Sequence, residues 1–517
     1  MKVCLEFSGP EKRLDLFLGE NLELSRSKIK SLIKAGHCQV NTKVIVKPSL
    51  LLKPGDRVEL EVPEEENSLQ AKPGQLQIID QQEDFLVLNK PAGISVHPAP
   101  SEKGDTLVHF LLHHFPELKK IQGERPGIVH RLDKDTSGLL LVALREETRV
   151  KLSSLFAQRL VDKKYVALVK GCPSPEKGEI DLPLGRDPRS KIKQAVLSKG
   201  GREARTSYEV LWTNGDYSLL KVKIFTGRTH QIRVHLSHLG HPILGDELYG
   251  GQIAPSSRQE QILSKLVKRQ LLHAFYLRFP WQNSWQEYEA DLPLDFKQAL
   301  LFLLKEPLKV VLLGLPGSGK SLVARELSPY VFEADKEVEN LYQPQADGYF
   351  LLTRILGPDI LTADKKIDKE RLFKYLQNPS LRREIEKSIH PLVLARWKNF
   401  QKTQATKPII VGDIPLYLET GLKEKDVLLV GIKRNPEERW QALKKRGWSE
   451  EKIETLDSFQ LPEEKKLKEA HFILNNSGNL EELRTKVRAL KRILLDLKRK
   501  RLRKKFSTLK RLLKEAR

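Results

Sequence analysis

Residues 128–138 have the sequence IVHRLDKDTSG and lead directly into an apolar stretch, Leu139–Ala143. A short apolar run that follows turn-forming residues predicts a buried strand, so the acidic segment is expected to be a loop at the start of that strand. A loop packed against a buried strand holds a carboxylate rigidly, as a reactive site requires. Asp133 is therefore a candidate catalytic residue.

The same loop admits two other interpretations. Asp133, Asp135, Ser137 and Gly138 match the first half of a calcium-binding loop. Such a loop needs a bidentate glutamate at its twelfth position, which is Leu144 here, so a calcium site is excluded. A plain turn, in which the two aspartates accept hydrogen bonds from nearby backbone N–H groups, stays open from this segment alone.

Three further segments accompany the loop: LVLNKPAGISVHP at 86–98, KKYVALV at 163–169, and TGRTHQIRVH at 226–235 followed by HPILGD at 241–246. Together with HRLDKDTSG, and in this order, they resemble the RluA family of pseudouridine synthases. The resemblance implies that Asp133 is the essential aspartate. It also implies that Tyr165 stacks near the target base and is a candidate proton acceptor, and that Arg228 pairs with the aspartate.

The family reaction breaks the bond between uracil and ribose, turns the base and rejoins it through carbon 5, which requires no cofactor. A carboxylate can attack the substrate directly or remove a ribose proton, and an adjacent guanidinium keeps it ionised. Both routes stay open. The target uridine must leave its stack, and an aromatic side chain such as Tyr165 offsets part of that cost, roughly 1–3 kcal/mol per stacked base.

Two groups of histidines at helical spacing suggest a metal site as an alternative: His109, His113 and His114, and His235, His238 and His241. No cysteine accompanies either group, and the second lies in or beside a family motif, so zinc is not expected. The three cysteines, Cys4, Cys38 and Cys172, are scattered and predict no disulfide framework.

A second functional motif begins after an apolar strand predicted at 309–313: Gly314-Leu315-Pro316-Gly317-Ser318-Gly319-Lys320-Ser321, followed by a helical pattern. These residues match the P-loop motif, and they lie between a predicted strand and a predicted helix, as a P-loop does. Its glycines let backbone N–H groups face a phosphate, Lys320 would neutralise the β- and γ-phosphates, and Ser321 would hold Mg²⁺. The motif predicts ATP binding but not the second substrate.

Later segments of this region resemble dephospho-coenzyme A kinase: EAD at 333–335, LGPDIL at 356–361, HPLV at 390–393, DIPL at 413–416 with Glu419, and then Gln460, Lys465 and Asn475. The family transfers the γ-phosphate of ATP to the ribose 3′-hydroxyl of dephospho-coenzyme A. By resemblance, Asp335 is the candidate base for that hydroxyl, and Asp413 lies by the substrate.

The kinase segment departs from its family at several positions. Glu333 stands where an aspartate is usual, and Leu322 where a threonine is usual. In the lid region Arg446 matches an expected arginine, but the arginine expected four residues earlier is Ala442, and Arg439 is a candidate substitute. Loss of a lid arginine weakens stabilisation of transition-state charge. An active kinase and a nucleotide-binding module with weak or altered activity both stay open.

The N-terminal 65 residues predict a small α+β unit. Ser25 is a candidate N-cap for a helix that stops at Gly36, short strands follow near 38–41 and 44–46, and Pro54-Gly55-Asp56 predicts a turn. The order of elements and the basic helix resemble an S-four-type RNA-binding domain. An acidic, polar segment at 63–68, PEEENS, predicts a linker to the next domain.

The charge of the chain is strongly basic and uneven. The formal net charge is +23, and more than half of it lies in residues 486–517, a predicted basic helical tail. A basic excess favours an anionic partner, and nothing else points to lipid, so structured RNA is the expected partner. The tail is either a solvated helix or a contact for ribosomal RNA. No apolar run is long enough to cross a membrane, and no secretory leader is evident, so a cytoplasmic protein is expected.

The sequence therefore predicts a multidomain α/β and α+β protein. It has an RNA-binding domain at 1–65, a pseudouridine synthase domain with a mixed, mainly antiparallel sheet at 66–305, a parallel α/β kinase-like domain at 306–485, and the tail. Two hypotheses stand. The first is a bifunctional enzyme that modifies RNA, expected to be from the large ribosomal subunit, and phosphorylates dephospho-coenzyme A with ATP and Mg²⁺. The second is an RNA-binding protein without catalysis. The oligomeric state is not predicted.

Overall fold

The computed structural model describes residues 2–515 apart from 23, 25, 63–68, 99–103, 122, 124, 191, 422–423 and 425. The predicted N-cap Ser25 and the predicted linker at 63–68 lie outside the described residues. The chain forms two compact units. One comprises Met1–Leu76, Ser95–Ile128 and Ala143–Glu147, and the other comprises Gln77–Ile94, Val129–Val142 and Thr148–Arg517.

The first unit contains the small α+β fold predicted at the N-terminus. Its sheet has the strand order β1-β6-β3-β4 with antiparallel pairs, and two helices supply apolar side chains to its core. The bounds are β1 Lys2–Phe7, β3 Cys38–Val40, β4 Lys43–Val44, β6 Asp56–Glu61, α1 Leu14–Asn21 and α2 Arg26–Lys34, with a short pair β2 Lys12–Arg13 and β5 Leu51–Leu52.

The same unit holds α3 (Leu107–His114) and the 3₁₀ helix η1 (Pro116–Lys120). Thr106 and His109 form a capping box at the start of α3, in which the Thr106 backbone N–H donates to Nδ1 of His109 at 2.9 Å. His109 therefore has a structural role. No cluster of three or more potential metal ligands occurs among the described residues.

The second unit begins with a nine-stranded sheet, with the order β11-β14-β15-β10-β16-β9-β8-β7 and β17 paired to β16. Strand β10 pairs antiparallel with β15 and β16, whereas β16 pairs parallel with β9, so the predicted mixed, mainly antiparallel sheet is confirmed. The strands are β7 Ile78–Gln81, β8 Phe85–Lys90, β9 Ser137–Ala143, β10 Asp162–Lys170, β11 Lys177–Asp181, β14 Arg205–Thr213, β15 Tyr217–Ile224, β16 Leu272–Trp281 and β17 Ser284–Glu289.

Helices and a small hairpin complete this region: α4 Glu146–Ala157, α5 Gln231–His238, α6 Arg258–Leu266, α7 Leu294–Leu303, and the pair β12 Leu184–Arg186 and β13 Gln194–Val196. Strand β9 is buried along its whole length, as its apolar sequence predicted. The loop that carries Asp133 is therefore fixed at the start of a core strand.

The next region is the predicted parallel α/β domain, confirmed by a five-stranded sheet of order β19-β20-β18-β21-β22 in which every adjacent pair is parallel. Alternate residues of the central strand serve two cores: Val311 packs with α9–α12, and Val310 packs with α8 and α16. The strands are β18 Leu308–Leu313, β19 Val331–Glu333, β20 Ile409–Asp413, β21 Val427–Lys433 and β22 Phe472–Asn475.

The helices of this region are α8 Lys320–Leu327, α9 Ala334–Leu341, α10 Asp347–Leu356, η2 Pro358–Ile360, α11 Lys369–Leu376, α12 Pro379–Thr403, α13 Pro436–Lys444, α14 Glu450–Ser458 and α15 Glu463–Lys468. Among the described residues, no helix combines the length and the apolar character that crossing a bilayer requires.

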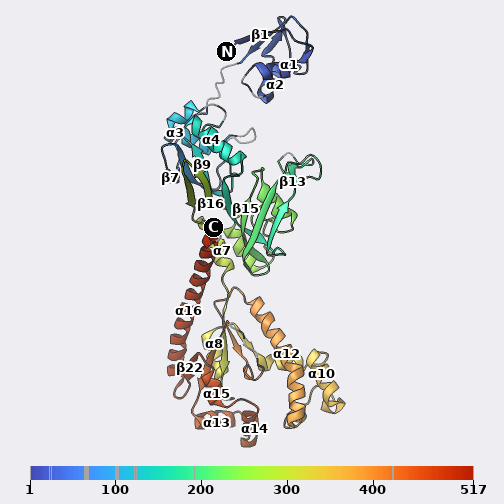
Figure 1. Ribbon diagram of the computed structural model, residues 1–517. Helices are drawn as coiled ribbons and strands as arrows, with labels where there is room; N and C mark the ends of the chain where they lie inside the picture. Colours follow the sequence, from blue (N-terminus) through green and yellow to red (C-terminus); the bar gives the residue numbers. More distant parts are fainter. Residues whose placement is uncertain are drawn as a thin grey trace. The chain divides into compact units, whose positions relative to one another are not determined.

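The basic tail is one long helix, α16 (Leu480–Glu515), which begins six residues before the predicted tail (Figure 1). It is amphipathic rather than solvated on all sides. Its N-terminal half buries Leu483, Val487, Leu490 and Leu494 in the core of the parallel sheet. Its C-terminal end buries Leu509 and Leu513 in a cluster that includes α6 and α7.

Candidate active sites

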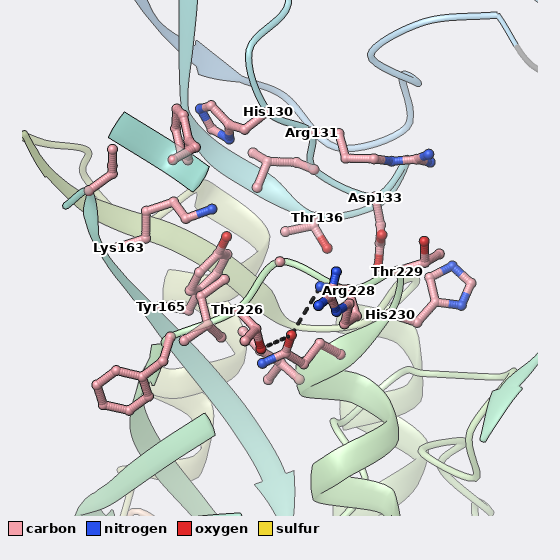
Figure 2. Close-up of a pocket in the computed structure, with 18 of the residues that line it drawn as sticks. His130, Arg131, Asp133, Thr136, Lys163, Tyr165, Thr226, Arg228, Thr229 and His230 are labelled. Carbon is pink, nitrogen blue, oxygen red and sulfur yellow. Dashed lines mark hydrogen bonds between the residues drawn. The ribbon is translucent and has the colours of Figure 1, made fainter. Parts of the chain in front are cut away.

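A pocket of about 360 Å³ lies above the acidic loop. Its wall is made by the loop itself, the end of α4, the start of β10, and the segment from β15 into α5. Figure 2 shows Asp133, Arg228 and His230 on one side of this pocket, and Lys163 and Tyr165 on the other. The segments singled out in the sequence at 128–138, 163–169 and 226–235 thus contribute to one site.

Buried cations hold the backbone of the acidic loop. Lys90, from the NKPAG segment, is almost fully buried and donates to the carbonyl oxygen of Lys134 at 2.9 Å, as well as to those of Pro91 and Ile94. Arg269 donates to the carbonyl oxygen of Asp135 at 2.8 Å. Burial lowers the pKa of Lys90 to about 7. These contacts fix the carbonyls that follow Asp133 and so restrict where its carboxylate lies.

The arginine that pairs with Asp133 is Arg233, not the predicted Arg228. Nη1 of Arg233 lies 3.2 Å from Oδ2 of Asp133, and the same guanidinium binds Asp246 through two bonds of 2.7 and 2.9 Å. The Arg233 side chain is 8% exposed and that of Asp246 is fully buried. A bidentate bond to a buried carboxylate fixes a guanidinium strongly, so Asp246 orients Arg233 and Arg233 orients Asp133.

Arg228 lines the pocket but is exposed, and its Nε donates to the carbonyl oxygen of Glu203 at 2.9 Å. The physical reason for the different pairing is the position of the helix. His230 adopts a left-handed conformation, with φ of 57°, and α5 starts at the next residue. Arg228 therefore precedes the helix, whereas Arg233 lies in its first turn. The sequence signal was available, because TGRTHQIRVH contains both arginines.

Tyr165 lies on β10 with its ring almost fully buried, and it lines the pocket as expected. Burial raises the pKa of Tyr165, and the charge of Asp133 raises it further. Its hydroxyl is therefore protonated at neutral pH and is available as a hydrogen-bond donor. The raised pKa disfavours the predicted proton-acceptor role of Tyr165.

The P-loop connects β18 to α8, as predicted. Gly314, Gly317 and Gly319 have φ of 152°, 78° and 96°, a region in which side chains are strained, so glycine is required there. Lys320 donates to the carbonyl oxygens of Gly314 and Leu315, both in the loop, at 2.9 and 3.1 Å. A phosphate bound in the loop would accept hydrogen bonds from the Lys320 ammonium group in place of these carbonyl oxygens.

A pocket of about 770 Å³ extends from the P-loop and includes Asp335 and Asp413 among its lining residues. Ser321 donates to Oδ2 of Asp413 at 2.7 Å, while Oδ1 of Asp413 is buried without a hydrogen-bond partner among the described residues. A hydroxyl and a carboxylate with a free buried oxygen fit a Mg²⁺ site. Burial raises the pKa of Asp335, and Asp413 adds to the effect, which makes Asp335 a better proton acceptor near neutral pH.

The arginines expected in the lid region differ in whether they face the pocket. Arg446 lines the pocket, as the resemblance implied. Arg439 is buried, binds Asp457 through two bonds of 3.0 and 2.5 Å, and donates to the carbonyl oxygen of Pro316. Its guanidinium is committed to these contacts, so it does not replace the arginine missing at Ala442. Arg434, which also lines the pocket and donates to the carbonyl oxygen of Gly317, is the nearer candidate.

The lysine that contacts Glu419 and Gln460 is Lys466, not Lys465, which the family resemblance had indicated. Lys465 is exposed, whereas Lys466 is fully buried, with its ammonium 3.0 Å from Oε1 of Glu419 and 2.7 Å from Oε1 of Gln460. Glu419 and Gln460 were both picked out by the resemblance, and the helical register of α15 decides which lysine joins them. This cluster supports the loop Asp413–Pro415, because Lys466 also donates to the carbonyl oxygen of Pro415.

Comparison with known proteins identifies three kinds of domain in the chain. Three family models match it in order: "S4 domain" at 12–58, "RNA pseudouridylate synthase" at 84–238 and "Dephospho-CoA kinase" at 308–482. The predicted order of the three domains is confirmed.

Curated relatives match about half of the chain over nearly their own full length. An uncharacterized RNA pseudouridine synthase of Aquifex aeolicus is 43% identical over 59% of this chain and 98% of its own length. One of Chloroflexus aurantiacus is 46% identical over 56% and 89%. "Ribosomal large subunit pseudouridine synthase D" of Zymomonas mobilis is 38% identical over 56% and 92%. The chain therefore belongs to the RNA pseudouridine synthase family, with a dephospho-CoA kinase domain following the synthase domain.

Proposed function

We propose that the synthase domain converts uridine to pseudouridine in structured RNA of the large ribosomal subunit, with Asp133 as the catalytic carboxylate. The observation that carries the proposal is the geometry of Asp133, which lines a 360 Å³ pocket and is held by Arg233 and the buried Asp246. The relatives named for large-subunit modification support the choice of RNA. The S4 domain supplies a second contact to the same substrate.

The chemistry follows from these residues. The uridine is turned out of its stack into the pocket, beside the ring of Tyr165, at a cost of a few kcal/mol that stacking partly offsets. The ionised carboxylate of Asp133, oriented by Arg233, then attacks C1′ of the ribose or removes the 2′ proton. Either event releases uracil with the electron pair of the C1′–N1 bond. The base turns within the pocket and C5 bonds to C1′, while Asp133 gives up its bond to C1′ or returns the 2′ proton. The proton on C5 is then lost and N1 of the base gains one.

The test of this proposal is the variant Asp133→Asn, which keeps the size of the side chain. We expect it to bind large-subunit RNA as the wild type does and to form no pseudouridine. Full activity in that variant would refute the assignment.

We further propose that the kinase domain transfers the γ-phosphate of ATP to the 3′-hydroxyl of dephospho-coenzyme A, which makes the chain bifunctional. Lys320 and the P-loop amides would hold the β- and γ-phosphates, Ser321 with Asp413 would hold Mg²⁺, and Asp335 would accept the hydroxyl proton. The raised pKa of Asp335 and its place in the same pocket as Lys320 and Asp413 support this assignment.

The alternative for this domain is a nucleotide-binding module with weak or altered activity, which Ala442 and the committed Arg439 favour. Incubating the full chain with ATP, Mg²⁺ and dephospho-coenzyme A separates the two. Formation of coenzyme A that Lys320→Ala abolishes supports the kinase. ATP binding without turnover supports the alternative.

A further inference from the structure

Lys163 is a cation inside the pocket of Asp133 that the reaction described above does not use. It lies two residues before Tyr165 on β10, and both side chains line the pocket. Figure 2 shows the Lys163 side chain directed into the pocket near the hydroxyl end of Tyr165. Its Nζ lies 4.9 Å from the centre of the Phe156 ring, and the described residues provide it with no ion pair or hydrogen bond.

The next lysine on the same strand, Lys164, does not face the pocket. Lys164 lies on the other face of β10, where its Nζ is 4.5 Å from the centre of the Tyr276 ring and 3.7 Å from Asp162. Asp162 also pairs with Lys223 at 2.8 Å, so Lys164 and Lys223, and not Lys163, neutralise the Asp162 carboxylate. Lys163 alone among these lysines faces the pocket.

An ammonium group in such a position is costly unless an anion reaches it. Burial lowers the pKa of Lys163 to about 8, which reflects the cost of holding the charge out of water. The ring of Phe156 lies beside it, and the half-buried His130, whose Nε2 accepts from the backbone N–H of Leu141, packs against that ring. A ligand that brings negative charge into this part of the pocket would be stabilised by Lys163 more than in water.

Two anions occur in the reaction, the RNA phosphates and the uracil that leaves C1′. Arg131, Arg159 and Arg228, which also line the pocket, are exposed and suit a solvated phosphate backbone. Lys163 is partly buried beside Tyr165, where the base is expected to lie. Its position therefore fits the base better than the backbone.

We propose that Lys163 binds the uracil ring through a carbonyl oxygen and stabilises the anion formed when the C1′–N1 bond breaks. The inference rests on the proposed function of the pocket. When the bond breaks, its electron pair passes to uracil and is shared by N1 and the carbonyl oxygens. Lys163 stays protonated throughout. Asp133 takes the bond to C1′ or the 2′ proton and gives it back when C5 bonds to C1′, which removes the charge on uracil. The C5 proton is then lost while N1 gains a proton, so the base stays neutral.

The proposal makes the rate depend on pH in a defined direction. The ammonium form is needed, so the rate should be full below pH 8 and should fall as the pH rises through about 8. The other titratable groups that face the pocket near Lys163 are His130, His230, Tyr165 and Asp133. The pKa values of the two histidines are lowered and that of Tyr165 is raised, which moves all three away from this range.

The experiment measures single-turnover pseudouridine formation by the full chain on a transcribed large-subunit RNA fragment, from pH 6 to 9.5, together with RNA affinity. The variants are Lys163→Met, Lys163→Arg and the control Lys164→Met. We expect Lys163→Met to be slower by about 10²-fold with RNA affinity within about threefold of wild type, which is the size of losing one charge-stabilising donor. Lys163→Arg should recover part of the rate and shift its decline to higher pH. Lys164→Met should keep the wild-type profile.

Other outcomes would overturn the proposal in distinct ways. Reduced RNA affinity with an unchanged rate for Lys163→Met would assign Lys163 to a phosphate. A decline near pH 8 that is the same in Lys163→Arg as in wild type would mean that another group titrates. If Lys163→Met is unstable, Lys163→Gln carries the same comparison. A wild-type chain that forms no pseudouridine would instead refute the proposed function itself.

Discussion

Arg233 is expected to be essential for both the stability of the synthase domain and its rate. Replacing it by glutamine leaves the fully buried Asp246 without the two bonds of 2.7 and 2.9 Å that now neutralise it. Removing one partner of a buried ion pair costs about 3–5 kcal/mol, because the other charge remains buried. For a domain of this size, the loss corresponds to a fall of roughly 6–20 °C in the apparent Tm.

The rate should fall for a separate reason. Asp133 would lose the contact of 3.2 Å that orients its carboxylate toward the pocket. A misplacement of about 1 Å in a reacting group can reduce a rate by about 10²-fold. Arg233→Lys should recover little, since one ammonium cannot reproduce the bidentate bond to Asp246 while it contacts Asp133.

The assay combines thermal unfolding with single-turnover pseudouridine formation, and Arg228→Gln is the matched control. Arg228 is exposed and makes one bond to a backbone carbonyl, so its loss should change stability by no more than about 1 kcal/mol. Asp246→Asn combined with Arg233→Gln should restore part of the Tm, because the buried charge is removed. An Arg233→Gln protein that melts and reacts like wild type would refute the reasoning.

Three further predictions concern other parts of the chain. Asp413→Asn should weaken Mg-ATP binding by about 10-fold or more while ATP binding without Mg²⁺ is unchanged, as titration calorimetry can measure, and equal effects in both conditions would contradict the Mg²⁺ role. Burial lowers the pKa of His273 from 6.5 to about 4, so its contribution to stability should be full above pH 6.5 and should fall by at most about 1.4 kcal/mol per pH unit down to pH 4. Denaturant unfolding of His273→Gln should show a weaker dependence of the unfolding free energy on pH. An unchanged pH dependence would contradict this role of His273. On α16, replacing three exposed arginines by glutamine should reduce the steepness of log RNA affinity plotted against log salt concentration by about 2–3. Replacing three lysines that contact the rest of the protein should instead lower the Tm and leave that salt dependence unchanged. Equal salt dependence in the two sets would exclude the exposed arginines from RNA binding. The two sets are Arg492, Arg499 and Arg503, and Lys498, Lys505 and Lys510.

The main features of the fold followed from local patterns. The apolar run at 139–143 is a fully buried strand, and the glycine-rich loop joins a strand to a helix, because both depend on residues that are adjacent in the sequence. The basic tail was also correctly expected to be helical. Its contacts were not predictable, since an amphipathic pattern does not say which surface covers its apolar face.

The details of the site depended on where individual helices begin. Whether Arg228 or Arg233 reaches Asp133 is decided by the left-handed turn at His230, and such boundaries are not fixed by propensity. The same limit explains Lys466, because a shift of one residue in α15 changes which lysine is buried. The sequence gives no signal for Lys163 for a different reason: a lysine is usually exposed, and only the three-dimensional pocket shows that this one is half-buried.

The most direct test of the central claim is the formation of pseudouridine in a transcribed large-subunit ribosomal RNA incubated with the wild-type chain or with Asp133→Asn. Pseudouridine is mapped at nucleotide resolution, and RNA binding is measured in parallel. We expect one or more modified positions with the wild type, none with Asp133→Asn, and equal binding by both proteins. Modification of the same positions by Asp133→Asn would contradict the catalytic role of Asp133.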